Sequence, residues 1–210
     1  MIMRRFLTEK FIRMAVANKS WDIGNKVLYD MCAKYPAHET AEVIIAKIWL
    51  IGRSYSAAIE RRRTSKPKRD GDRFYEKKVA GKIRRSDIDA WFQTLRANGS
   101  TDVALKIHRD VTDLFERISK LRKRSLASKY LHFHFPSRFY IFDSRAQSAL
   151  RRVITRREKI KKSSKHDFTY AKFFGDCETL RVEIRFRYGL ELEPRDLDKV
   201  LLAVSAKIKK

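Results

Sequence analysis

Two side chains of this sequence, Lys129 and Asp143, have the types and surroundings that acid, base or nucleophilic chemistry needs. Lys129 belongs to the stretch SLASKY at residues 125–130, and Asp143 follows the aromatic segment at residues 139–142. Each is expected where a helix begins, and there the unpaired backbone N–H groups and the helix dipole favour an anion such as a phosphate. An aspartate kept ionised at such a point can stabilise a developing positive charge or orient a water molecule. A lysine whose pKa is lowered by burial can attack an electrophilic carbon and form an imine.

Helices are expected to position both residues, because apolar side chains recur at helical spacing along most of the chain. No segment alternates with a period of two, and the 210 residues include 7 glycines and 4 prolines. The fold class is therefore predicted to be all-α. Ser20 and Asp143 are expected to cap helices, and Gly189 to end one. Helices are expected over residues 2–17, 20–36, 39–60, 86–98, 101–121, 143–154 and 167–188 and from Pro194 onward, with 39–60 as the central buried helix.

The charge of the chain points to a polyanionic partner. Lys and Arg number 49 against 25 Asp and Glu, which gives a net charge of +24. An anionic lipid surface would also suit this charge, but no lipidation motif and no apolar stretch of membrane-spanning length is present. Nucleic acid is the expected partner. Two basic runs, at residues 61–73 and 151–165, are either solvated linkers or segments that contact phosphates.

Neither a metal nor another cofactor is expected. Cys32 and Cys177 are far apart and have no CxxC spacing, so a disulfide framework and a cysteine zinc site are not indicated, and a reducing cytosol fits. His132 and His134 are two residues apart and do not share a helix face, and no third ligand accompanies them.

The central stretch resembles the helix-hairpin-helix DNA glycosylase superfamily, of which the chain would be a divergent member. Residues 125–129, SLASK, resemble the hairpin in which a Gly-x-Gly-x-Lys turn precedes a helix, with Ser125 and Ala127 in place of the glycines. Asp143 followed by a helix resembles the catalytic aspartate of that superfamily. The resemblance covers residues 101–150, and it implies that Asp143 is catalytic and that Lys129 stands where bifunctional members keep their Schiff-base lysine.

The same resemblance implies a fold and a function. The chain would be a single domain, 1–210, built as a two-lobed helical bundle with a helix-hairpin-helix element and a cleft between lobes. One lobe would comprise approximately residues 1–60 and 165–210, and the other approximately residues 73–160. The protein would bind double-stranded DNA, flip a modified or damaged base and hydrolyse its N-glycosidic bond, leaving an abasic site. We expect a monomer that acts in the cytoplasm on the nucleoid.

Further residues are candidates for contact with DNA, and each has a purely structural alternative. An aspartate before a helix is often only a cap, a lysine can be a phosphate contact, and aromatic residues at helical spacing are mostly core. The candidates for phosphate contact are Lys123, Arg124, Ser125, Ala127, Ser128 and Arg145. The candidates for the base pocket or for a wedge are Trp91, Tyr130, His132, Phe139 and Tyr140.

Several functional alternatives stay open. Hydrolysis without lyase activity is the preferred mechanism, and an imine at Lys129 is the alternative. The base is not readable from the sequence; a repair substrate is the conservative choice, and a hypermodified base of phage DNA in a defence role is another. A non-catalytic DNA- or RNA-binding module would explain the charge equally well. A nuclease ranks last, because it would need clustered acidic metal ligands and the acids here are scattered.

Overall fold

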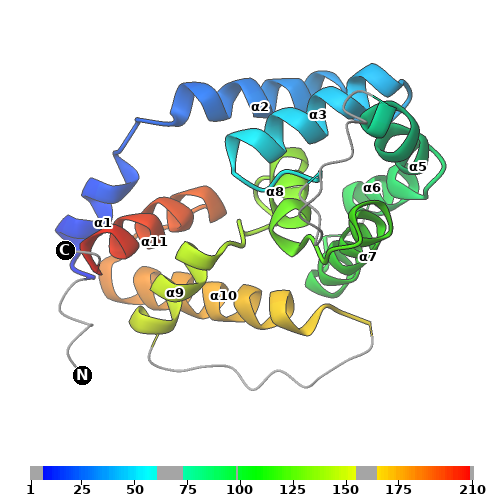
Figure 1. Cartoon of the computed structure of the whole chain (residues 1–210). Coiled ribbons are helices and arrows are strands. Elements are labelled where there is room, and N and C mark those ends of the chain that lie inside the picture. Colours follow the sequence, from blue (N-terminus) through cyan, green and yellow to red (C-terminus); the bar gives the residue numbers. More distant parts are fainter. Residues whose placement is uncertain (1–6, 61–72, 98, 155–164, 209–210) are drawn as a thin grey trace.

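The chain forms a helical protein, which confirms the predicted all-α class (Figure 1). The computed structural model describes residues 7–60, 73–97, 99–154 and 165–208, and no strand occurs among them. Figure 1 shows α9, α10 and α11 together on one side and α5, α6 and α7 on the other. The helices are α1 (Glu9–Val16), α2 (Asp22–Lys34), α3 (Ala41–Ser54), η2 (Phe74–Ala80, a π-helical stretch), α5 (Gly81–Arg84), α6 (Ile88–Ala97), α7 (Thr101–Ser119), α8 (Arg124–His134), α9 (Ser144–Val153), α10 (Phe168–Tyr188) and α11 (Pro194–Ile208).

The most deeply buried helix is α8 and not, as expected, the segment at residues 39–60. Every residue of α8 from 126 to 133 is buried, and the helix packs against α2, α3 and α7. The expected central helix, α3, buries Ile44, Ile48 and Ile51 but leaves Trp49 45% exposed. The neighbours of α3, which are α2, η2, α5 and α8, leave Trp49 partly open, whereas α2, α3 and α7 cover α8 from residue 126 to residue 133.

Several helix ends fall where the sequence placed them. Asp143 caps α9 through its Oδ1, which accepts a hydrogen bond from the backbone N–H of Ala146 at 2.8 Å. Gly189 ends α10 in the left-handed conformation, with a φ of 64°, and α11 begins at Pro194. The expected cap at Ser20 is wrong, because α2 starts one residue later and has no side-chain cap.

The turn before α8 lies earlier in the chain than expected. Residues 125–129 do not form a hairpin; they form the first turns of α8, which begins at Arg124. The chain turns at residues 120–123, where Lys120 takes a left-handed conformation with a φ of 63°. Without glycines, the stretch SLASK has no residue that favours a turn and continues as helix. Lys129 therefore lies in the middle of a helix and not at its N-terminus.

One apolar core runs through the described part of the chain. Buried apolar side chains from α1 to α11 belong to one continuous cluster. Within it, α1 and α9 pack against α11, while α2 and α3 pack against α8. The division into two lobes, with residues 1–60 and 165–210 in one of them, stays a prediction.

Candidate functional site

The structure brings Lys129 and Asp143 together. Lys129 Nζ lies 3.7 Å from Asp143 Oδ2, although the residues belong to α8 and to the cap of α9. The ammonium group also donates hydrogen bonds to Ser125 Oγ at 2.7 Å and to the carbonyl oxygen of Phe142 at 3.3 Å. The lysine side chain is 1% exposed and the aspartate side chain 27% exposed. A buried cation thus lies behind a carboxylate that solvent can reach.

One face of α8 contacts the residue that precedes Asp143 at the start of α9. Ser125, Ser128 and Lys129 are at positions i, i+3 and i+4, so they share this face. Ser128 Oγ accepts a hydrogen bond from the backbone N–H of Phe142 at 3.0 Å. Together with the bond from Lys129 to the Phe142 carbonyl, this fixes both polar backbone groups of the residue before the aspartate. The position of Asp143 is therefore set by α8 as well as by its own helix.

Burial and neighbouring charges act in opposite directions on the pKa of Lys129. Burial has the larger effect and lowers the pKa of its ammonium group below the usual value, and the carboxylates of Asp143 and Asp198 oppose this in part. The ring of Tyr55 adds a cation–π contact, with Lys129 Nζ 5.7 Å from the ring centre. The ammonium form is supported by an acid, an aromatic ring and two hydrogen-bond acceptors.

A second acid, Asp198 of α11, lies within electrostatic reach of this pair, and the sequence did not indicate it. Asp198 is 4% exposed and forms an ion pair with Arg195, one turn earlier in the helix. Burial raises its pKa to about 6, against the opposing charge of Arg195, and the charges of Asp143 and Lys129 also act on it. In the sequence, an Asp three residues after an Arg in a terminal helix is indistinguishable from an exposed surface pair.

The candidates for phosphate contact differ in how far their side chains are buried. Arg145 is exposed and Ser125 is half-buried. Ala127 and Ser128 are fully buried, so their side chains cannot reach a phosphate, and the expectation for these two is corrected. The physical reason is the helical course of residues 125–129, which turns them into the core.

Lys123 and Arg124 are both engaged within the chain. Lys123 Nζ donates a hydrogen bond to the carbonyl oxygen of Ala58 at 2.9 Å. Arg124 Nε lies 2.7 Å from both carboxylate oxygens of Asp167, the buried residue that caps α10. These contacts connect the start of α8 to α10 and to the segment that follows α3, which is a structural role.

Four of the five aromatic candidates are buried in the core, and for these four the expectation of a base pocket or a wedge is corrected. Their polar ends are bound within the protein: the Tyr130 hydroxyl donates to His38 Nε2 at 2.6 Å, and the Tyr140 hydroxyl donates to Glu178. His132 donates through Nδ1 to the Phe139 carbonyl at 2.7 Å. Helical spacing on α8 and packing of the following loop explain their burial. Tyr130, His132, Phe139 and Tyr140 are at most 2% exposed, and Trp91 is half-buried against the core.

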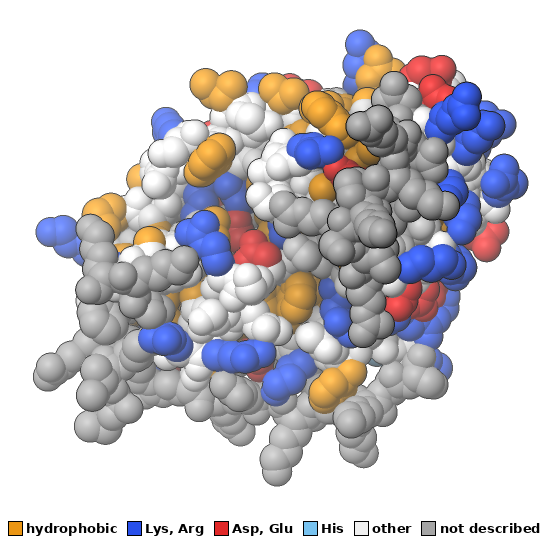
Figure 2. Space-filling view, in the orientation of Figure 1, with side chains coloured by type: hydrophobic (Ala, Val, Ile, Leu, Met, Phe, Trp, Pro, Cys, Tyr) orange, Lys and Arg blue, Asp and Glu red, His pale blue; other side chains and the backbone are white. Residues whose placement is uncertain are grey.

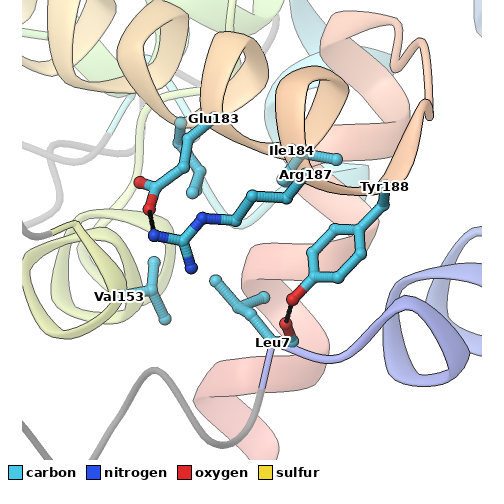
Figure 3. A pocket seen from close by; sticks show the side chains of 7 residues that line it. Leu7, Val153, Glu183, Ile184, Arg187 and Tyr188 are labelled. Carbon is cyan, nitrogen blue, oxygen red and sulfur yellow. Dashed lines mark hydrogen bonds and ion pairs between the residues drawn. The ribbon is translucent and has the colours of Figure 1, made fainter.

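A pocket between α9, α10 and the residues before α1 is too small for a base (Figure 3). Its volume is about 20 Å³, which is room for about one water molecule. In Figure 3 the Tyr188 hydroxyl donates to the carbonyl oxygen of Leu7 at 2.6 Å, and Arg187 pairs with Glu183 at 2.6 Å. These contacts connect α10 to the residues before α1, and the space beside them is too small to hold a base.

Among the charged side chains visible on the described surface, basic ones are more widespread than acidic ones (Figure 2). Figure 2 shows Lys and Arg spread over this face, with fewer Asp and Glu among them. The two basic runs expected as linkers or phosphate contacts, residues 61–73 and 151–165, fall largely outside the described residues. In the described part of the chain, no three His, Cys, Asp or Glu side chains are grouped closely enough to hold a metal ion.

Comparisons of the chain with protein-family models, with curated proteins and with solved structures gave no significant match. Any inference about function therefore depends on the residues of this chain and on their geometry. None of the helices in the described ranges combines the length and the apolar character that a bilayer span requires.

Proposed function

We propose that the protein is a DNA glycosylase, a divergent relative of the helix-hairpin-helix superfamily, that flips a modified base and hydrolyses its N-glycosidic bond. The observation that carries the proposal is the placement of Asp143. Its carboxylate lies at the N-terminus of α9, 3.7 Å from the buried ammonium group of Lys129. A helix dipole and a cation both favour the ionised carboxylate, and 27% of the side chain is open to solvent.

An ionised carboxylate in this position suits cleavage of a glycosidic bond. When the bond between C1′ and the base nitrogen breaks, the base leaves with the electron pair and the sugar takes on positive charge. Asp143 would stabilise that charge and orient the water molecule whose oxygen attacks C1′. The proton from the water goes to the departing base or to solvent. The products are a free base and an abasic site.

In this proposal Lys129 is a positioning residue. Its side chain is buried behind Asp143 and donates to Ser125 and to Phe142, so the amine is not aimed at solvent. A nucleophilic lysine must be neutral and must reach C1′. The contacts made by Lys129 favour hydrolysis without lyase activity.

The net charge of +24 supports DNA as the partner, and it equally supports a binding protein without catalytic activity. In either case affinity for duplex DNA should fall steeply as salt rises, because binding releases condensed counterions. Base release separates the two functions, since a binding protein leaves the DNA intact.

The test is the variant Asp143→Asn, incubated with duplexes that carry different damaged or hypermodified bases, with free base measured by mass spectrometry. The wild type should release base from at least one duplex. The variant should lose release by about a thousandfold or more, because the charge that faces the developing cation is gone. Folding and DNA binding should persist, since asparagine caps helices about as well as aspartate.

The matched control is Asp102→Asn, which removes the charge of an exposed aspartate in the first turn of α7. It should leave base release unchanged. Release by Asp143→Asn at the wild-type rate would show that the residue is only a cap. Binding of DNA by the wild type without release from any duplex would favour the non-catalytic alternative.

A further inference from the structure

Three buried polar atoms near the Lys129–Asp143 pair have no hydrogen-bond partner among the described residues. They are Nδ2 of Asn25 on α2, and Nε of Arg195 and Oδ1 of Asp198 on α11. Asn25 is 6% exposed and Asp198 4% exposed. A buried donor or acceptor without a partner costs about 1–3 kcal/mol, so each such atom calls for a partner, which can be a ligand or an ordered water molecule.

The three atoms come from α2 and α11, two helices that an ion pair connects. On α11, Arg195, Asp198 and Lys199 are at positions i, i+3 and i+4 and share one face. Lys199 Nζ pairs with Asp22 Oδ1, at the start of α2, at a distance of 2.9 Å. Asn25 lies three residues after Asp22 and therefore shares its face of α2. The ion pair thus brings the turn of α2 that carries Asn25 near the turn of α11 that carries Arg195 and Asp198.

A chain of contacts connects this region to the proposed reaction site. Asn25 Oδ1 accepts a hydrogen bond from the Tyr55 hydroxyl at 2.7 Å. The ring of Tyr55 is 5.7 Å from Lys129 Nζ, which in turn is 3.7 Å from Asp143. The charges of Arg195 and Asp198 also contribute to the pKa of Tyr55, which burial raises. In Figure 1, α8 lies near the middle of the molecule, α2 runs along the top, and α9 and α11 lie at the lower left.

We propose that Asn25, Arg195 and Asp198 form the polar edge that recognises the flipped base, and that this base has a lactam edge, with an N–H beside a C=O. Two donors and one carboxylate acceptor fit that pattern. A carbonyl oxygen has two lone pairs and accepts from both Asn25 and Arg195, while the adjacent N–H donates to Asp198. Guanine, hypoxanthine and uracil types have this edge. The ring nitrogen of an adenine or cytosine type has one lone pair and leaves one donor unpaired.

Because the three atoms are buried, a base reaches them when α2 and α11 separate. The Lys199–Asp22 ion pair is a contact that has to open, and the Asp22 side chain is 41% exposed. A pair that exposed is typically worth no more than about 1 kcal/mol, so it resists separation weakly. Flipped bases are commonly read through hydrogen bonds to their Watson–Crick edge, which is the edge that this site would hold.

This inference rests on the proposed glycosylase function, and its test uses the full chain. Duplexes carrying hypoxanthine, uracil or 8-oxoguanine are compared with duplexes carrying N6-methyladenine or 5-methylcytosine, and kcat/KM for base release is measured for each. The wild type should act on lactam bases by preference. Asp198→Asn keeps the size of the side chain and exchanges an acceptor for a donor, so kcat/KM for the preferred base should fall by about tenfold to hundredfold.

Asp196→Asn is the matched control, because it removes a carboxylate of the same helix turn and should leave selectivity unchanged. If Asp198→Asn does not fold, Asn25→Leu removes a donor from the other helix and should lower the lactam preference as well. Absence of release from every duplex by the wild type overturns both the function and this inference. Release without lactam preference, or with the same preference in folded Asp198→Asn and Asn25→Leu, overturns the inference alone.

Discussion

The contacts of Lys129 distinguish two mechanisms that the sequence pattern left open. These are hydrolysis and attack by the lysine to form an imine. Its ammonium group has Ser125 Oγ at 2.7 Å, the Phe142 carbonyl oxygen at 3.3 Å and Asp143 Oδ2 at 3.7 Å. These acceptors engage the donors of the ammonium group, and the side chain is 1% exposed. Deprotonation would leave these acceptors without a cation. The residue is thus suited to hold the carboxylate in place, and a covalent role would require it to leave all three contacts.

The expected outcome of borohydride trapping follows from these contacts. Wild-type protein treated with borohydride on a DNA from which it releases base should give no covalent adduct, and strands should break only after alkali or heat. Lys129→Met should lower base release by about tenfold to hundredfold without abolishing it, since Asp143 remains and loses a positioning partner. Gel analysis of trapped and alkali-treated DNA provides the measurement. Efficient trapping that disappears in Lys129→Met would establish the imine mechanism in its place.

Some residues of the site were predictable from the sequence and others were not. Asp143 was expected as a cap because the chemistry of helix starts is local, and the structure places it there. Asp198 and Asn25 gave no signal. Their significance depends on which buried atoms remain without a partner once the helices are in place, and that is a property of tertiary structure.

Among the elements, α8 contributes most to the proposed site, and it was the element most misread. Its stretch SLASK was expected to be a hairpin by analogy with glycine-rich turns, but serine and alanine allow the helix to begin earlier. As a helix, the same residues place Ser125, Ser128 and Lys129 on one face. Because residues 125–129 were expected to form a turn, the helical spacing that lets α8 contact residues 142–143 was not recognised in the sequence.

Ser128 tests whether α8 positions Asp143. In Ser128→Ala the backbone N–H of Phe142 loses its acceptor, a bond of 3.0 Å in the wild type. Leaving a buried donor unpaired should lower the free energy of unfolding by about 1–3 kcal/mol. Base release should fall as well, because the residue before Asp143 is no longer held.

Urea unfolding and base-release rates measure the two effects on Ser128→Ala. Ser148→Ala, at an exposed position of α9, is the control and should change neither quantity. Unchanged stability and unchanged release in Ser128→Ala would mean that the loop holds Asp143 without help from α8.

At the scale of the whole molecule, the chain combines a strongly basic composition with several neutral histidines in its interior. Burial lowers the pKa of His38 and of His132 to about 4 and that of His108 to about 3, and it places the pKa of His134 well below 6.5. The all-α class could be predicted from spacing alone, since apolar periodicity reports which face of a helix is buried. The protonation states of the histidines could not be predicted from the sequence, because they depend on burial by helices that are distant in sequence.

These histidines should make the protein sensitive to acid. A group whose pKa is lower in the folded than in the unfolded state binds fewer protons when folded, so its contribution to stability is complete above about pH 6.5 and is lost as pH falls toward 4. Each such histidine contributes a slope of about 1.4 kcal/mol per pH unit within this window. Asp198 acts in the opposite direction, since burial raises its pKa from 3.8 to about 6 and stability due to it declines as pH rises between these values.

The histidines outnumber Asp198, so the free energy of unfolding should fall between pH 6.5 and pH 4. His108 provides the sharpest check, because its ring stacks on Tyr170 with centres 3.4 Å apart and phenylalanine can keep that stacking. Urea unfolding of His108→Phe across this range should show a slope smaller by about one proton than that of the wild type. Equal slopes in the two proteins would mean that His108 does not change its protonation on unfolding. A wild-type stability that stays constant from pH 6.5 to pH 4 would contradict neutral burial of the histidines as a group.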